Sequence, residues 1–77
     1  MTSLDEDPRA ASLAFGQRLR ELRAARHISQ DTLARRTDVH PTAIGRLERG
    51  DREPRLTTIL RIARGLEVQP GALLDEL

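Results

Sequence analysis

A chain of 77 residues without cysteine is one small domain with an aliphatic core, because neither a disulfide nor a thiolate metal site can add stability. Phe15 is its only aromatic residue, which argues against a stacking platform for single-stranded nucleic acid. No apolar run reaches membrane-spanning length and the acidic N-terminal stretch lacks the apolar segment of a signal peptide, so we expect a soluble cytoplasmic protein with no membrane partner.

The formal net charge of +1 conceals an uneven distribution of charge along the chain. Residues 12–66 contain twelve arginines and six acidic residues, a net charge of +6, and the acids that offset it lie at the two ends. Arginine binds phosphate and guanine through a planar fork of donors. The composition therefore fits a polyanionic partner, although an ordinary solvated helical surface could carry the same excess.

Apolar periodicity predicts five short helices. Residues 1–11 are polar and aperiodic, and we expect a disordered arm there, followed by one domain over residues 12–77. The first helix is predicted over residues 12–26, with Ser12 as its N-cap. The apolar residues that define this helix are Phe15, Leu19 and Leu22.

Capping signals delimit the second and third helices. Ser29 is a suitable N-cap for a second helix that runs to Thr37. Pro41 opens the third helix, because at the first helical position its missing N–H costs no hydrogen bond. Gly50 closes the third helix. Only a few residues separate the two helices, too few for a strand.

Leucines dominate the fourth and fifth helices. The fourth is predicted from Leu56 to Leu66, and Pro70 starts a short fifth helix. One side of so short a helix cannot bury three leucines within a single chain. We expect one of them to close the core and the others to form a two-fold, self-complementary patch that makes a homodimer, unless all are core and the protein pairs only on its polyanionic partner. The dimerisation candidates are Leu73, Leu74 and Leu77.

Two helices joined by a tight turn, the second opened by proline and bearing an outward arginine, are typical of a helix-turn-helix unit. The stretches "RLRELRAARHISQDTLA", "IGRLERG" and "LTTILRIARGLEV" follow in order. Over residues 14–74 the chain resembles the phage repressor and Cro-type helix-turn-helix family, also called the xenobiotic-response-element type. The resemblance implies an all-α, compact five-helix lambda-repressor-like domain with the helix-turn-helix at the second and third helices.

The resemblance also implies that the third helix lies in the major groove of double-stranded DNA and presents its N-terminal residues to base edges. Arg46 is the strongest candidate, because its guanidinium can pair with O6 and N7 of guanine. His40 has two interpretations, a base contact or an N-cap in place of the usual Ser or Thr. The residues expected along this edge are His40, Thr42, Ala43 and Arg46.

Contacts to the DNA backbone are implied on both sides of the third helix. Ser29 and Gln30 begin the second helix, whose unpaired N–H groups suit a phosphate, and Gln30 is also expected to brace the third helix. Arg49, Arg52 and Arg55 follow the third helix and are expected to reach phosphates beside the groove. Each of these arginines could instead pair with a neighbouring acidic residue.

A partly buried salt bridge between Arg23 and Glu48 is implied as a tie between the first and third helices. Loss of one partner of a well-buried pair costs roughly 3–5 kcal/mol. Asp38 and Glu67 stand where the family often has glycine, and Asp tolerates a left-handed backbone better than most residues. Gly45 lies inside the third helix, is expected to weaken it by roughly 0.5–1 kcal/mol relative to Ala, and offers no side chain to DNA.

The sequence therefore favours a sequence-specific DNA-binding transcriptional regulator, of repressor or controller type, that acts as a homodimer on a palindromic operator. The alternative is an antitoxin or protein-interaction module with secondary DNA binding, against which the lack of an obvious toxin-wrapping tail argues. Two histidines and no cysteine assemble neither a nucleophile with its base nor a metal site, so we expect no enzyme activity, cofactor or small-molecule ligand.

Overall fold

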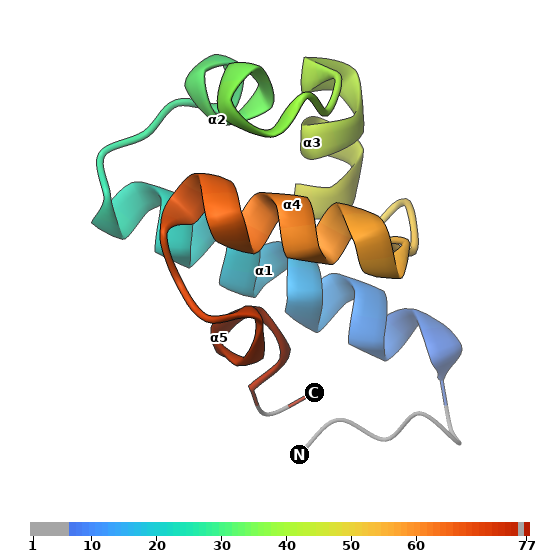
Figure 1. Ribbon diagram of the computed structural model, residues 1–77. Coiled ribbons are helices and arrows are strands. Elements are labelled where there is room, and N and C mark those ends of the chain that lie inside the picture. The colour runs from blue at the N-terminus through green and yellow to red at the C-terminus, as the bar shows by residue number, and fades with distance from the viewer. Residues whose placement is uncertain (1–6, 76) are drawn as a thin grey trace.

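The computed structural model describes residues 7–75 and 77, and over those residues the chain forms five helices and no strand (Figure 1). The predicted all-α fold is confirmed. None of the described helices has both the length and the apolar character to cross a membrane. The helices are α1 (Pro8–Ala25), α2 (Gln30–Thr37), α3 (Pro41–Glu48), α4 (Leu56–Leu66) and α5 (Pro70–Leu74).

The helices pack around one aliphatic core. α1 contacts α3 and α5, α2 contacts α3 and α4, and α4 contacts α5. Figure 1 shows α2 and α3 together at one end of the molecule and α5 at the opposite end. The large side chains that are fully buried come from every helix: Phe15, Leu19, Leu33, Ile44, Leu47, Ile62, Leu66 and Leu73.

Helix α1 begins one turn earlier than predicted. Asp7, and not Ser12, is its N-cap: Asp7 Oδ1 accepts a hydrogen bond from the Arg9 N–H at 2.9 Å, and Pro8 occupies the first helical position. The prediction of a disordered arm over residues 1–11 is therefore wrong for residues 8–11. The cap, the proline and two alanines form this turn without apolar periodicity. Residues 1–6 lie outside the described residues.

The other helix starts and ends follow the sequence signals. Ser29 Oγ accepts a hydrogen bond from the Thr32 N–H at 3.1 Å and caps α2. Left-handed residues follow four helices: His27 after α1 (φ 55°), Asp38 after α2 (φ 57°), Gly50 after α3 (φ 74°) and Glu67 after α4 (φ 58°). The turn of the helix-turn-helix thus tolerates Asp in place of the usual glycine.

Glycine lets α1 approach α3 closely. A Cβ on Gly16 would stand 2.6 Å from the Glu48 carbonyl oxygen and closer still to that of Leu47. Any side chain at this position would push the two helices apart. The distance between α1 and α3 is therefore set by the contact of Gly16 with the backbone of α3.

Helix α5 closes the core with Leu73, so the prediction that Leu73 serves dimerisation is wrong. Its side chain is 0% exposed, because it faces inward from α5 and joins the core cluster. Leu77 is half-buried against the same cluster, whereas Leu74 is 41% exposed. Arg18 Nε of α1 donates to the Ala72 carbonyl at 2.8 Å and holds α5 in place.

Candidate nucleic-acid interface

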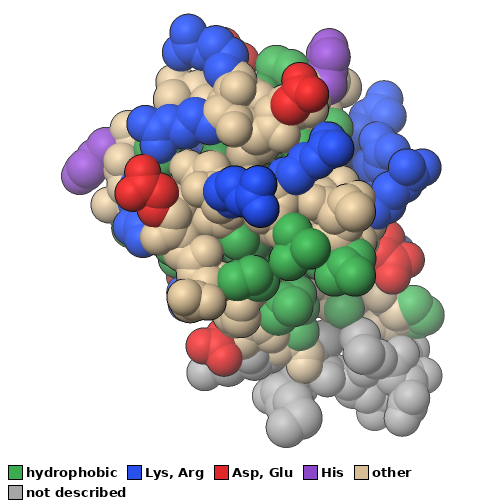
Figure 2. Space-filling view, in the orientation of Figure 1, with side chains coloured by type: hydrophobic (Ala, Val, Ile, Leu, Met, Phe, Trp, Pro, Cys, Tyr) green, Lys and Arg blue, Asp and Glu red, His purple; other side chains and the backbone are tan. Residues whose placement is uncertain are grey.

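Helix α3 has one buried and one exposed side. Ile44 and Leu47 are fully buried, which directs Thr42 and Arg46, four residues apart, to the exposed side. Ala43 is half-buried beside them. Figure 2 shows arginine side chains gathered at the side of the molecule where α3 lies. An exposed edge of this kind, flanked by positive charge, suits the acceptors of a DNA groove.

His40 caps α3. Its Nδ1 accepts a hydrogen bond from the Thr42 N–H at 3.1 Å, the role that Ser or Thr has in most helices. A neutral imidazole that accepts through Nδ1 carries its proton on Nε2. The imidazole of His40 can therefore only donate a hydrogen bond to a DNA base, through Nε2–H.

Glu48, the last residue of α3, is 4% exposed and lies among donors from two other helices. Arg23 of α1 approaches both carboxylate oxygens, with Nε 2.6 Å from Oε2 and a second nitrogen 2.9 Å from Oε1. Gln30 of α2 donates to Oε1 at 3.0 Å, and Arg20 Nε lies 3.6 Å from the same oxygen. One carboxylate thus ties α1, α2 and α3 together and fixes the direction of α3.

The ionised state of Glu48 is favoured by its surroundings. Burial acts to raise the pKa of this carboxyl, but hydrogen bonds from Arg23 and Gln30, with the charges of Arg23 and Arg20, outweigh burial and hold the pKa below its ordinary value. The hydrogen bond to Glu48 raises the pKa of Arg23 against the opposing effect of desolvation. Both partners are therefore charged at neutral pH.

Arg49, directly after Glu48, forms an exposed ion pair. Its Nε lies 3.1 Å from Asp51 Oδ2, and the two side chains are 57% and 52% exposed. The guanidinium leans back over α3: its Nη1 is 3.3 Å from the point where a Cβ on Gly45 would stand. Of the two alternatives for Arg49, the structure shows the pair with an acid.

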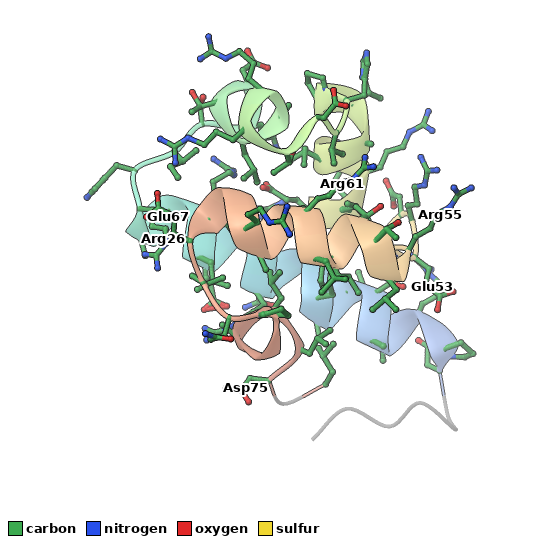
Figure 3. The ribbon with its side chains drawn as sticks, viewed as in Figure 1. Arg26, Glu53, Arg55, Arg61, Glu67 and Asp75 are labelled. Carbon is green, nitrogen blue, oxygen red and sulfur yellow. The ribbon has the colours of Figure 1, made fainter. Side chains whose placement is uncertain are left out.

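A groove of about 220 Å³ runs between α3 and the first turns of α4. Arg55, Thr58 and Arg61 line it from one side of α4, and Figure 3 labels both arginines. Arg52 of the preceding loop joins them. None of these three arginines forms an ion pair within residues 7–75, although Asp38 and Glu53 also line the groove. Sequence reasoning missed Arg61, which the spacing of three residues from Arg55 through Thr58 would have indicated.

Residues 19–73 match the model of the helix-turn-helix family. The chain belongs to this family. The control protein C.BamHI of Bacillus amyloliquefaciens is 44% identical over 64 residues, which cover 82% of this chain and 79% of that protein. Two solved structures are also similar to this helix-turn-helix protein.

The restriction-modification controller protein C.AhdI from Aeromonas hydrophila has 44% identity and a TM-score of 0.81, over 83% of this chain and 97% of that one. The clp gene regulator ClgR from C. glutamicum has 26% identity and a TM-score of 0.79, over 83% of both chains. The similarity therefore extends over nearly the whole helix-turn-helix domain.

Several arginines of this helix-turn-helix protein form hydrogen bonds that stabilise the fold. Arg26 Nε donates to the Leu66 carbonyl, and Arg36 donates to the Gly65 carbonyl at 3.4 Å, so two arginines satisfy carbonyls at the end of α4. Figure 3 shows Arg26 beside Glu67, at the end of α4. Part of the arginine excess is thus used inside the domain and is not available to a polyanion.

Proposed function

We propose that this protein is a sequence-specific double-stranded DNA-binding transcriptional regulator with α3 as its recognition helix. The observation that carries the proposal is the tie at Glu48, because it joins α3 to α1 and α2 and leaves Thr42 and Arg46 exposed on the opposite side. Two of the similar proteins are named as controllers and one as a gene regulator. We therefore assign a regulatory role of repressor or controller type.

The base contacts are assigned to the exposed edge of α3. Arg46 pairs with O6 and N7 of a guanine, Thr42 bonds a base edge or packs its methyl group on thymine, and Ala43 offers an apolar contact. His40 donates through Nε2 while its Nδ1 caps the helix. The phosphate contacts are assigned to the start of α2, at Ser29 and Gln30, and to the groove between α3 and α4, at Arg52, Arg55 and Arg61.

The active form is a homodimer that pairs through α4 and α5. Figure 2 shows hydrophobic side chains gathered over these helices, below a row of arginines. Leu56, Leu60 and Leu74 are 69%, 45% and 41% exposed, and the half-buried Leu77 lines a pocket together with Leu74. Pairing of this surface with a second copy would place two recognition helices about 34 Å apart, which selects a palindromic site.

Selection of bound sites from a random DNA pool tests the proposal. We expect a palindromic consensus, and we expect Arg46→Ala to cost about 1–3 kcal/mol on that site and to relax the preference at one base pair in each half-site. If the wild-type protein selected no consensus, the proposed function would be wrong. An unchanged consensus with Arg46→Ala would contradict the assignment of the recognition helix.

Sedimentation of the DNA-free protein at micromolar concentration tests the dimer. We expect a dimer, and we expect Leu74→Asp to give a monomer because a charge would then be buried in the interface. A matched control, Leu13→Asp, places the same charge on another exposed leucine, which is 46% exposed and lies on α1 beside Gly50, not on α4 or α5. A monomeric wild-type protein, or equal dissociation in both variants, would contradict the dimer surface.

A further inference from the structure

The surface over Gly45 is covered by two polar side chains from different elements. A Cβ at this position would stand 3.3 Å from Arg49 Nη1 and 3.9 Å from Gln30 Oε1. Gly45 is buried although α3 is otherwise exposed along this edge, because these two side chains lie over it. Arg49 therefore occupies the space that an ordinary side chain at residue 45 would take.

Because it lies over Gly45, the Arg49 guanidinium is directed toward the N-terminal half of α3. Arg49 lies one turn beyond Gly45, and a side chain that leans back over that turn approaches the part of the helix that carries Thr42 and Arg46. An Arg49 side chain directed straight outward would lie beside the end of the helix, next to the DNA backbone. Its observed direction is back along α3, over Gly45 and toward Thr42 and Arg46.

Asp51 determines which donors remain for a ligand. Asp51 Oδ2 accepts a hydrogen bond from Arg49 Nε–H, and neither terminal nitrogen of Arg49 donates a hydrogen bond within residues 7–75. A guanidinium held at Nε presents its two terminal nitrogens, the donors that pair with O6 and N7 of guanine. The charge of Asp51 also offsets that of Arg49, which makes the pair a poor partner for a phosphate.

We propose that Arg49 reads a guanine, and that Gly45 and Asp51 are the residues that position it for this contact. The proposal rests on the proposed DNA-binding function and replaces the backbone contact expected for Arg49. Because Gly45 has no side chain, the Arg49 guanidinium can lie against α3, and Asp51 holds that guanidinium in one orientation before DNA binds. Less side-chain freedom is then lost on binding than for an unsupported arginine.

The test compares affinity for the selected operator with affinity for the same operator changed at one guanine in each half-site. In the wild-type protein we expect a preference of about tenfold or more at the guanine that Arg49 contacts, and we expect Arg49→Ala to abolish it. Asp51→Asn and Gly45→Val should each remove most of the preference for the guanine that Arg49 contacts. Neither variant should change the preference for the base that Arg46 contacts. Gly71→Val is the matched control for Gly45→Val, because a Cβ at Gly71 meets no atom within 4 Å.

A double-variant comparison separates displacement of Arg49 from a direct clash with DNA. If Gly45→Val acts by displacing Arg49, it has no further effect on the preference in an Arg49→Ala protein. Equal losses with and without Arg49 would overturn the positioning role of Gly45, and an unchanged preference in Asp51→Asn would overturn that of Asp51. If Arg49→Ala weakened binding to all DNA sequences equally and made the affinity less dependent on salt, Arg49 would contact a phosphate instead. A wild-type protein without a consensus would contradict the proposed function itself.

Discussion

Two ion pairs lie side by side at the end of α3 and serve different purposes. Glu48 is 4% exposed and joins Arg23, whereas the neighbouring Arg49 is more than half exposed and joins Asp51. Both pairs have charge-assisted hydrogen bonds, of 2.6 and 2.9 Å between Arg23 and Glu48 and of 3.1 Å between Arg49 and Asp51. The difference is burial: the first pair holds three helices together, and the second leaves the terminal nitrogens of Arg49 exposed to a ligand.

Breaking the buried pair should have the largest effect on stability. We expect Arg23→Ala and Glu48→Ala each to lower the free energy of unfolding by about 3–5 kcal/mol, because each strands a buried charge. The double variant should lose less than the two single losses combined, since no charge is then left alone. Urea unfolding of the three variants measures these values. Additive losses would contradict a shared buried bridge.

Acid should weaken the buried pair selectively. The pKa of Glu48 is lower in the folded than in the unfolded chain, so its contribution to stability is present above the ordinary glutamate pKa of about 4.3 and is lost as the pH falls further. Thermal unfolding between pH 7 and pH 3 measures this loss. We expect Glu48→Gln to be less stable at pH 7 but to lose less on acidification. Parallel pH profiles of the two proteins would contradict this assignment.

Glycine substitutions test the packing near the exposed pair, because Gly45 lies beneath Arg49. We expect Gly45→Ala to raise the free energy of unfolding by about 0.5–1 kcal/mol, since the helix gains propensity and the tip of Arg49 can shift by a few tenths of an ångström. Gly65→Ala should destabilise instead, because its Cβ would stand 2.5 Å from Thr37 Cγ2 between α2 and α4. Thermal unfolding of both variants decides the sign at each position.

Breaking the exposed pair should have the smallest effect on stability. We expect Asp51→Asn to change the free energy of unfolding by at most about 1 kcal/mol, because solvent screens both charges. Its effect should be seen in DNA recognition and not in folding. A loss as large as that of Glu48→Ala would show that the two pairs do not differ in the way their burial suggests.

The sequence predicted the helices wherever local signals agreed. Ser29, Pro41 and Gly50 mark the boundaries of α2 and α3, and apolar periodicity predicted α4. The start of α1 was missed because Asp7 and Pro8 begin a turn whose alanines form no apolar periodicity. Leu73 was misassigned because the spacing of three leucines does not show which of them faces inward.

Contacts between distant residues were the least predictable part of the candidate site. Arg18 and its carbonyl partner Ala72 are 54 residues apart, and no local pattern distinguishes this arginine from one that binds phosphate. The Arg23 and Glu48 pair was expected only from the resemblance to a known family. The position of Arg49 over Gly45 depends on the direction of a side chain, which spacing along the chain does not give.

The approach of Gly16 to the carbonyls of Leu47 and Glu48 has a consequence for engineering. Since the backbone of α3 sets this distance, the outward residues of α3 can be exchanged without altering how the helix is mounted on α1. If α3 reads DNA as proposed, exchange of the exposed Thr42 and Arg46 changes the operator preference while the mounting of α3 on α1 stays the same.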